Sequence, residues 1–196
     1  MSTVVAAIPV KPFGDAKRRL ASVLSVEERA ILSRELARRT VEAAAQGGAV
    51  PVVLSADDQV TSWAEERGVD VLLDEGSSLN EAATTACRLL AERRSAWMII
   101  HADLPILSPA DVAAAVAVVG SGRPVLAPSS DGGTSLVGWD RVIDFSYGPG
   151  SFHRHLATLA QADPAILGGP GWWLDLDTEH DLHAARRHPR GEWLGT

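Results

Sequence analysis

Aspartate side chains follow two of the apolar segments that we expect to be strands. Asp103 comes just after one such segment, and Asp175 and Asp177 follow another. Magnesium is held in proteins by one or two carboxylates together with phosphate oxygens of a substrate. Ser108 is the expected N-cap of the next helix, so Asp103 is free for another role. We therefore predict that Asp103, Asp175 and Asp177 bind Mg2+. A helix-capping role for Asp177 is the alternative.

Two glycine-rich segments that carry hydroxyl groups form a second candidate site. Residues 131–134 read Asp-Gly-Gly-Thr, and residues 147–153 read Tyr-Gly-Pro-Gly-Ser-Phe-His and run into an expected helix. Backbone N–H groups freed by glycine, next to a helix N-terminus, make a seat for an anion. The two segments therefore predict the binding of phosphate or carboxylate groups.

A basic cluster follows the first apolar segment. Lys11 comes directly after it, and Lys17, Arg18 and Arg19 come a few residues later. Point charges and guanidinium groups of this kind bind phosphates at the edge of a sheet. We expect Lys11 and Lys17 to contact phosphates, and a solvated basic surface is the alternative.

The bulk composition limits the classes of protein to consider. The chain has 196 residues, a net charge of −7 and 46% hydrophobic residues. We expect a single domain over residues 1–187 and a weakly ordered tail over 188–196. The negative charge argues against nucleic-acid binding. No apolar run is long enough to span a membrane, and no basic leader precedes the first one, which favours a cytoplasmic protein.

Apolar runs alternate with helical patterns along the chain. Strands are expected at 4–8, 51–55, 69–73, 97–101, 125–127, 135–137 and 172–174, and helices at 26–45, 58–67, 79–92, 108–119, 151–161 and 178–187. Fully apolar strands separated by helices predict a parallel sheet covered on both faces, an α/β fold of three layers. The break in alternation between 125 and 151 predicts a mixed, mostly parallel sheet with one antiparallel strand. Ligands then bind at the carboxyl ends of the strands.

The cysteine and three of the histidines predict little chemistry. Cys87 is the single cysteine and lies in a helical pattern, so we expect a small core residue. His101, His153 and His155 match no zinc spacing. We expect His101 to be a packed strand residue, and contact with substrate stays open for His153 and His155.

Seven short motifs resemble, in order, those of one known family. The sequence is similar to the guanylyltransferases of deazaflavin coenzyme (coenzyme F-420) biosynthesis, which comprise the 2-phospho-L-lactate and phosphoenolpyruvate guanylyltransferases. The motifs run from the first strand to the last helix and lie at 11–12, 17–20, 79–82, 102–105, 131–134, 147–152 and 175–178. The Gly-rich, arginine-containing loop of many other nucleotidyltransferases is missing after the first strand, which counts against a molybdenum-cofactor or sugar nucleotidyltransferase.

The resemblance implies a nucleotide-diphospho-sugar-transferase-like fold, Rossmann-like in its layers. It implies transfer of GMP from GTP to the phosphate of a three-carbon acid, with release of pyrophosphate. Lys11 and Lys17 would then lie at the triphosphate, and Asn80 would lie near the nucleoside. Lys11, Lys17 and Asp103 would be the catalytic residues. The resemblance places Mg2+ at Asp103, Asp175 and Asp177, and the acceptor acid at Thr134, Gly148, Gly150 and Ser151.

Alternatives remain for the acceptor and for the class of protein. The acceptor phosphate is already ionised at neutral pH, so no protein nucleophile is needed. Phosphoenolpyruvate is favoured by overall resemblance, and 2-phospho-L-lactate and 3-phosphoglycerate are the alternatives. Two other classes of protein also remain. One is a nucleotidyltransferase with another base or acceptor, and the other is a non-catalytic module that binds a nucleotide or a phosphometabolite. The sequence predicts no oligomeric state.

Overall fold

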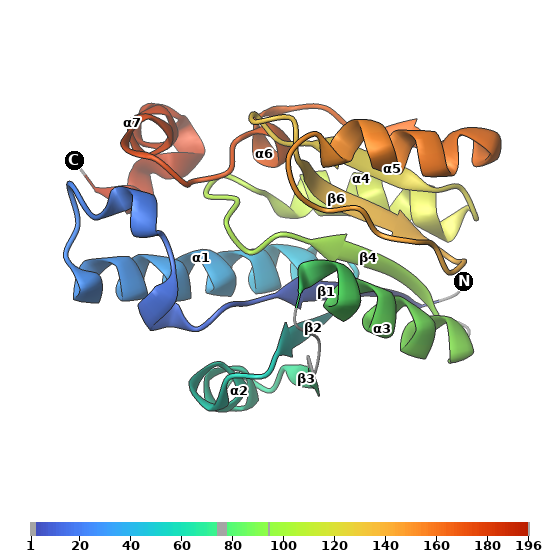
Figure 1. Cartoon of the computed structure of the whole chain (residues 1–196), viewed down its shortest axis with the longest axis horizontal. Helices are drawn as coiled ribbons and strands as arrows, with labels where there is room; N and C mark the ends of the chain where they lie inside the picture. The colour runs from blue at the N-terminus through green and yellow to red at the C-terminus, as the bar shows by residue number, and fades with distance from the viewer. Residues whose placement is uncertain (1–2, 74–77, 94, 196) are drawn as a thin grey trace.

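The computed structural model describes residues 3–73, 78–93 and 95–195, and a β-sheet is its middle layer (Figure 1). Within these residues the sheet has seven strands in the order β3-β2-β1-β4-β6-β5-β7. The strands are β1 Val4–Pro9, β2 Val50–Ser55, β3 Asp70–Leu73, β4 Ala96–Ile100, β5 Val125–Pro128, β6 Thr134–Trp139 and β7 Ala165–Ile166.

The sheet is mixed and mostly parallel, as expected. β1 pairs in parallel with β2 and with β4, β2 pairs in parallel with β3, and β5 pairs in parallel with β7. β6 runs antiparallel to both of its neighbours, β4 and β5. The antiparallel strand lies in the region where the regular strand–helix alternation breaks.

Helices cover both faces of this sheet (Figure 1). Alternate side chains of β1 pack on opposite faces, because successive residues of a strand point to opposite sides. Val4, Ala6 and Ile8 join the core under α1, α2 and α4, whereas Val5 and Ala7 join the core under α3 and α5. The helices are α1 Val26–Gln46, α2 Asp58–Glu65, α3 Leu79–Glu92, α4 Pro109–Gly120, α5 Ser151–Leu159, α6 Pro170–Trp173 and α7 Glu179–Arg187.

Local signals in the sequence explain where several helices begin. Ser25 and Thr178 form capping boxes with Glu28 and Asp181 at the starts of α1 and α7. Ser108 caps α4 and also forms a capping box. Cys87 is buried in the core, as expected. In the part of the chain that the structure describes, no helix is long and apolar enough to cross a membrane.

The strand expected at 172–174 is wrong, because residues 170–173 form the short helix α6. Pro170 stands at the first helical position, where its fixed φ favours a helix. Gly169 precedes it with a φ of 125°, which turns the chain before the helix. The last strand is instead β7, whose two residues are too few to show a periodic pattern.

The C-terminal tail contacts the domain. Residues 189–194 form a 3-10 helix. Trp193 Nε1 donates a hydrogen bond to the carbonyl of Pro105 at 3.0 Å, and Arg190 Nη1 donates to Asp111 Oδ2 at 2.6 Å. The tail thus packs beside the loop that follows Asp103. The last expected tail residue, 196, lies outside the described residues.

Candidate functional site

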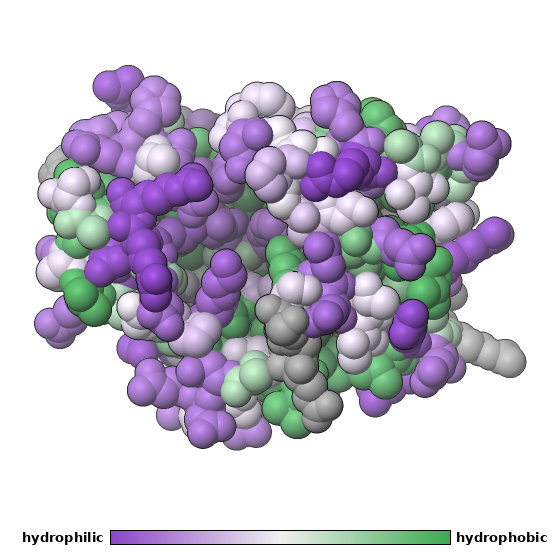
Figure 2. All heavy atoms as spheres, viewed as in Figure 1, coloured by the Kyte–Doolittle hydropathy of each residue, from purple (hydrophilic) through white to green (hydrophobic). Residues whose placement is uncertain are grey.

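The carboxyl ends of β1 and β4 lie side by side and bring the predicted polar residues to one edge of the sheet. The two strands pair in parallel, so the loop with Lys11 and Lys17 leaves the sheet beside Asp103. Leu176 N donates to the carbonyl of Asp103 at 2.9 Å, which fixes the segment 175–177 at the same edge. Figure 2 shows a hollow lined by hydrophilic residues on this face of the molecule.

Lys17 bridges two of the three predicted metal ligands. Its Nζ lies 2.9 Å from Asp103 Oδ2 and 2.9 Å from Asp177 Oδ1, and its side chain is 8% exposed. Burial alone would lower the pKa of Lys17, but the two carboxylates outweigh it and hold the pKa above its ordinary value. Burial would likewise raise the pKa of Asp103, but the ammonium group outweighs it and keeps that pKa low. Lys17 and Asp103 are therefore both charged at neutral pH.

Asp175 has a different partner from Asp177, although the two are separated by a single residue. Ser130 Oγ donates a hydrogen bond to Asp175 Oδ1 at 3.0 Å. Burial, together with the nearby charge of Asp103, raises the pKa of Asp175 to about 6. The structure therefore gives the two aspartates different surroundings, which the sequence could not distinguish.

The carboxylates suit a cation that is completed by substrate phosphates. Among the described residues, no three His, Cys, Asp or Glu side chains are grouped closely enough to hold a metal ion by themselves. Magnesium needs only one or two carboxylates when phosphates supply further oxygens. Asp103 Oδ1 is buried and has no hydrogen-bond partner within the described chain, so it is an available ligand atom. The residues present therefore fit Mg2+ bound together with a nucleotide.

A buried hydrogen-bond chain lies at the second predicted site. Thr134 Oγ1 lies 3.0 Å from Ser151 Oγ and 3.0 Å from His155 Nδ1, and all three residues are buried. His155 Nε2 accepts a hydrogen bond from the backbone N–H of Ser146 at 2.9 Å. Burial, with a smaller effect of Arg154, lowers the pKa of His155 to about 4, so the ring is neutral at neutral pH.

The two glycine segments lie next to each other. Phe152 N donates to the carbonyl of Gly132 at 3.4 Å, which joins the segment 131–134 to the segment 147–152. Gly148 and Gly150 have φ angles of 117° and 69°, in the region that L-residues with a Cβ rarely adopt. The guanidinium of Arg154 donates to the carbonyls of Ser146 (2.7 Å) and Pro149 (2.6 Å) and so holds this turn.

Asn80 and Tyr147 connect the two parts of the site. Asn80 Oδ1 accepts a hydrogen bond from the backbone N–H of Tyr147 at 2.6 Å. The ring of Tyr147 lies 5.2 Å from the ring of His101, the residue that follows β4. His101 is therefore packed, as expected, but against the glycine turn.

Sequence reasoning missed the positioning roles of Arg154 and His155. His155 stands four residues after Ser151, so both project from the same side of α5. The four-residue spacing in the sequence could have indicated that Ser151 and His155 are neighbours on the helix. The partner Thr134 comes from β6, and no local pattern could have indicated it.

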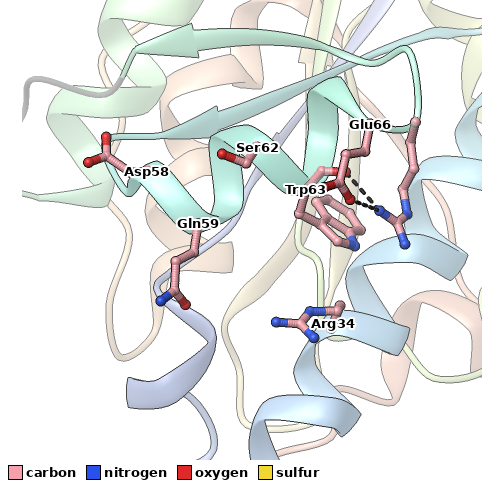
Figure 3. Close-up of a pocket in the computed structure, with 7 residues that line it drawn as sticks. Arg34, Asp58, Gln59, Ser62, Trp63 and Glu66 are labelled. Carbon is pink, nitrogen blue, oxygen red and sulfur yellow. Dashed lines mark hydrogen bonds and ion pairs between the residues drawn. The ribbon is translucent and has the colours of Figure 1, made fainter.

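A separate pocket lies between α1 and α2 and is lined by none of the predicted site residues (Figure 3). Its volume is about 580 Å3, and its lining residues are Arg34, Asp58, Gln59, Ser62, Trp63, Glu66 and Arg67. Trp63 packs edge-on against Phe13 with 5.5 Å between ring centroids, and the Arg34 guanidinium lies 5.0 Å from the Phe13 ring. These contacts anchor the loop between Lys11 and Lys17.

The fold is that of the nucleotide-diphospho-sugar-transferase-like proteins. The chain is similar to a crystal structure described as a nucleotide-diphospho-sugar transferase from Desulfovibrio desulfuricans G20, with a TM-score of 0.81 and 19% identity. The similarity covers 99% of this chain and 94% of that chain. It confirms the expected fold.

Comparison with families then identifies the group within this class. Residues 4–190 match the family model described as "Guanylyl transferase CofC like", and the chain belongs to this family. It is 36% identical over 188 residues to a phosphoenolpyruvate guanylyltransferase of Rubrobacter xylanophilus, covering 92% of each chain. It is 30% identical over 190 residues to a 2-phospho-L-lactate guanylyltransferase of Methanothermobacter thermautotrophicus, covering 95% of this chain and 85% of that one. The resemblance that the motifs indicated is confirmed.

Proposed function

We propose that this protein transfers GMP from GTP to the phosphate of phosphoenolpyruvate, with release of pyrophosphate, in coenzyme F-420 biosynthesis. The family and the 36% identical phosphoenolpyruvate guanylyltransferase support this reaction class and this acceptor. The observation that carries the proposal is the convergence of Lys17, Asp103 and Asp177 at one edge of the sheet, with Nζ 2.9 Å from both carboxylates. The bridge lies at the carboxyl end of the strands, where α/β proteins bind their ligands.

The two halves of the site divide the substrates between them. Lys11 and Lys17 neutralise the phosphates of GTP, and Asn80 contacts the nucleoside. The turn with Gly148 and Gly150 offers backbone N–H groups to the acceptor acid, and Thr134 and Ser151 fix that turn and face the same acid. The division is supported by Asn80, whose hydrogen bond to Tyr147 N joins the two halves.

The chemistry consists of positioning two anions that repel each other. An oxygen of the acceptor phosphate attacks the α-phosphorus of GTP, and the bond from that phosphorus to the bridging β-phosphate oxygen breaks, so pyrophosphate leaves. The acceptor phosphate has a second pKa of about 6 and needs no general base. When bound, Mg2+ held by Asp103 with Asp175 or Asp177 supplies neutralisation of the phosphate charges. Lys11 and Lys17 add to this neutralisation, and the glycine turns orient the acid.

The proposed partners are GTP and one three-carbon phospho-acid. The net charge of −7 argues against nucleic-acid binding, and the local basic cluster that includes Lys11 and Lys17 supports the binding of small anions. We infer from the ordinary globular composition that the protein works in the cytoplasm and away from membranes.

The direct test is turnover with GTP, Mg2+ and each candidate acid, followed by mass detection of the product. Phosphoenolpyruvate, 2-phospho-L-lactate and 3-phosphoglycerate are offered separately, and ATP and CTP replace GTP in parallel reactions. We expect the GMP adduct of phosphoenolpyruvate to dominate. A dominant product from another acid would overturn the acceptor but leave guanylyl transfer intact. Melting shifts with these ligands and no product with any of them would indicate a non-catalytic binding module.

A further inference from the structure

The ammonium group of Lys17 lies between Asp103 and Asp177, two of the three carboxylates that the proposed function considers as metal ligands. Nζ lies 2.9 Å from Asp103 Oδ2 and 2.9 Å from Asp177 Oδ1. The lysine side chain is 8% exposed, whereas those of Asp103 and Asp177 are 28% and 40% exposed. The cation is thus the most enclosed member of the group, and it holds two like charges together that would otherwise repel each other.

The backbone at Lys17 adopts a conformation that its local sequence does not favour. Its φ and ψ are 54° and 40°, the left-handed region. Among the described residues only Asp163 shares a positive φ without being glycine. Aspartate visits this region readily because its short side chain can bond locally, whereas lysine has no such help. The long-range ion pairs to Asp103 and Asp177 are therefore what compensates for this backbone conformation.

A divalent cation and the ammonium group compete for the same oxygen atoms. Two positive charges between one pair of carboxylates repel each other, and each needs the lone pairs that the other uses. When the ammonium group leaves the carboxylates, the side chain of Lys17 has a new partner only if phosphates are nearby. The nucleotide supplies those phosphates.

We propose that Lys17 is the resident counter-ion of Asp103 and Asp177, and that a divalent cation displaces its ammonium group onto the phosphates of the nucleotide. This inference rests on the proposed function, because it takes the metal site from it. Metal and nucleotide then bind cooperatively, and each raises the affinity for the other by the same factor. Without nucleotide the metal binds weakly, because the displaced lysine has no partner.

The test is calorimetric titration of the metal-free protein with Mg2+ alone. Lys17→Gln removes the competing cation, and we expect it to bind Mg2+ about 10-fold more tightly than the wild type. It is also expected to melt at a lower temperature without metal and to show a larger melting shift with Mg2+. Equal or weaker Mg2+ binding by Lys17→Gln would overturn the proposal.

Arg19→Gln is the matched control for a general loss of positive charge. Arg19 Nη1 lies 4.0 Å from Asp177 Oδ2, and the Arg19 side chain is 73% exposed, so it neither bridges the carboxylates nor fills their space. We expect the Mg2+ affinity of Arg19→Gln to stay within about 3-fold of the wild type, because exposed ion pairs contribute little. If Arg19→Gln gained as much Mg2+ affinity as Lys17→Gln, the loss of one positive charge would explain both variants. That result would contradict displacement of the ammonium group by the metal.

Two further measurements separate this inference from the proposed function and from a failure to fold. Lys17→Arg keeps the charge, and its guanidinium forms stronger pairs with carboxylates, so we expect weaker Mg2+ binding than in the wild type. A non-hydrolysable GTP analogue is expected to raise Mg2+ affinity more in the wild type than in Lys17→Gln. An unchanged Mg2+ affinity in Asp103→Asn would mean that the metal binds elsewhere, which defeats the metal site of the proposed function itself.

Discussion

Asn80 Oδ1 accepts a hydrogen bond from the backbone N–H of Tyr147 at 2.6 Å and ties the first turn of α3 to the glycine turn before α5. The two residues are 67 positions apart in the sequence, so the contact joins distant parts of the chain. Because the oxygen of the Asn80 amide is used in this contact, only its NH2 group remains for the nucleoside. Asn80 thus has one positioning contact and one group left for recognition.

Substitution at Asn80 is expected to separate these two roles. Asn80→Asp keeps an oxygen for Tyr147 N but loses the NH2 group, whereas Asn80→Ala loses both. We expect Asn80→Asp to raise the KM for GTP by about 10-fold, the value of one lost hydrogen bond to an uncharged group, and to leave the KM for the acid within about 3-fold. Asn80→Ala is expected to raise both constants. Steady-state kinetics measures them, and an unchanged KM for GTP in Asn80→Asp would show that the amide does not read the nucleoside.

Thr134 is expected to stabilise the acceptor half of the site through its hydroxyl group. In Thr134→Val, His155 Nδ1 and Ser151 Oγ each lose a partner in a buried place. Leaving such groups unsatisfied costs about 1–3 kcal/mol, and each kcal/mol lowers the Tm of a chain of this size by about 2–4 °C. Thr134→Ser keeps the hydroxyl and is the control. Thermal unfolding measures the difference, and equal Tm values for the Val and Ser variants would refute the role of the hydroxyl.

Asp175 gives the metal-free protein a pH dependence of stability with a definite sign. Burial raises its pKa to about 6, whereas the unfolded chain has a value of about 3.9. Folding therefore favours the protonated form, so this contribution is present below pH about 4 and is lost as the pH rises through about 6. Asp175→Asn removes the charge but keeps an oxygen for Ser130.

We therefore expect Asp175→Asn to melt at a higher temperature than the wild type at pH about 7.5, and at the same temperature at pH about 4. The measurement is thermal unfolding with EDTA present. Asp163→Asn is the control, because the Asp163 side chain is 89% exposed and pairs only with Arg123 among the described residues. A lower Tm for Asp175→Asn at the higher pH would show that the charged carboxylate stabilises the fold.

Much of the fold could be predicted because its signals are local. The apolar runs at β1, β2 and β4 and the capping boxes at Ser25 and Thr178 each depend on a few neighbouring residues. The expected strand at 172–174 failed because Pro170 starts a helix that is too short to show a helical period. β7 has two residues and shows no period either, so no local pattern distinguishes it from a loop.

The candidate site was predicted as a set of residues but not as a set of contacts. The sequence predicted Lys17, Asp103 and Asp177 near phosphates and metal, because they follow segments that we expected to be strands, although the segment before Asp177 is the short helix α6. Their mutual bridge depends on the left-handed backbone at Lys17, which no sequence pattern specifies. The separation of Asp175 from Asp177 depends on Ser130, a residue from another loop. Contacts of this kind arise from tertiary packing and were therefore beyond the reach of local reasoning.

The central claim is that Asp103 belongs to a metal-dependent guanylyl-transfer site. The most direct measurement is the rate of pyrophosphate release from GTP and phosphoenolpyruvate, with Mg2+ and with EDTA, for the wild type, Asp103→Asn and the Asp163→Asn control. Loss of a charged metal ligand removes several kcal/mol of stabilisation from the phosphates in the transition state, so we expect at least about a 100-fold loss in Asp103→Asn. We expect Asp163→Asn to match the wild type in turnover, and we expect EDTA to abolish the turnover of both. Full Mg2+-dependent turnover in Asp103→Asn would contradict the account.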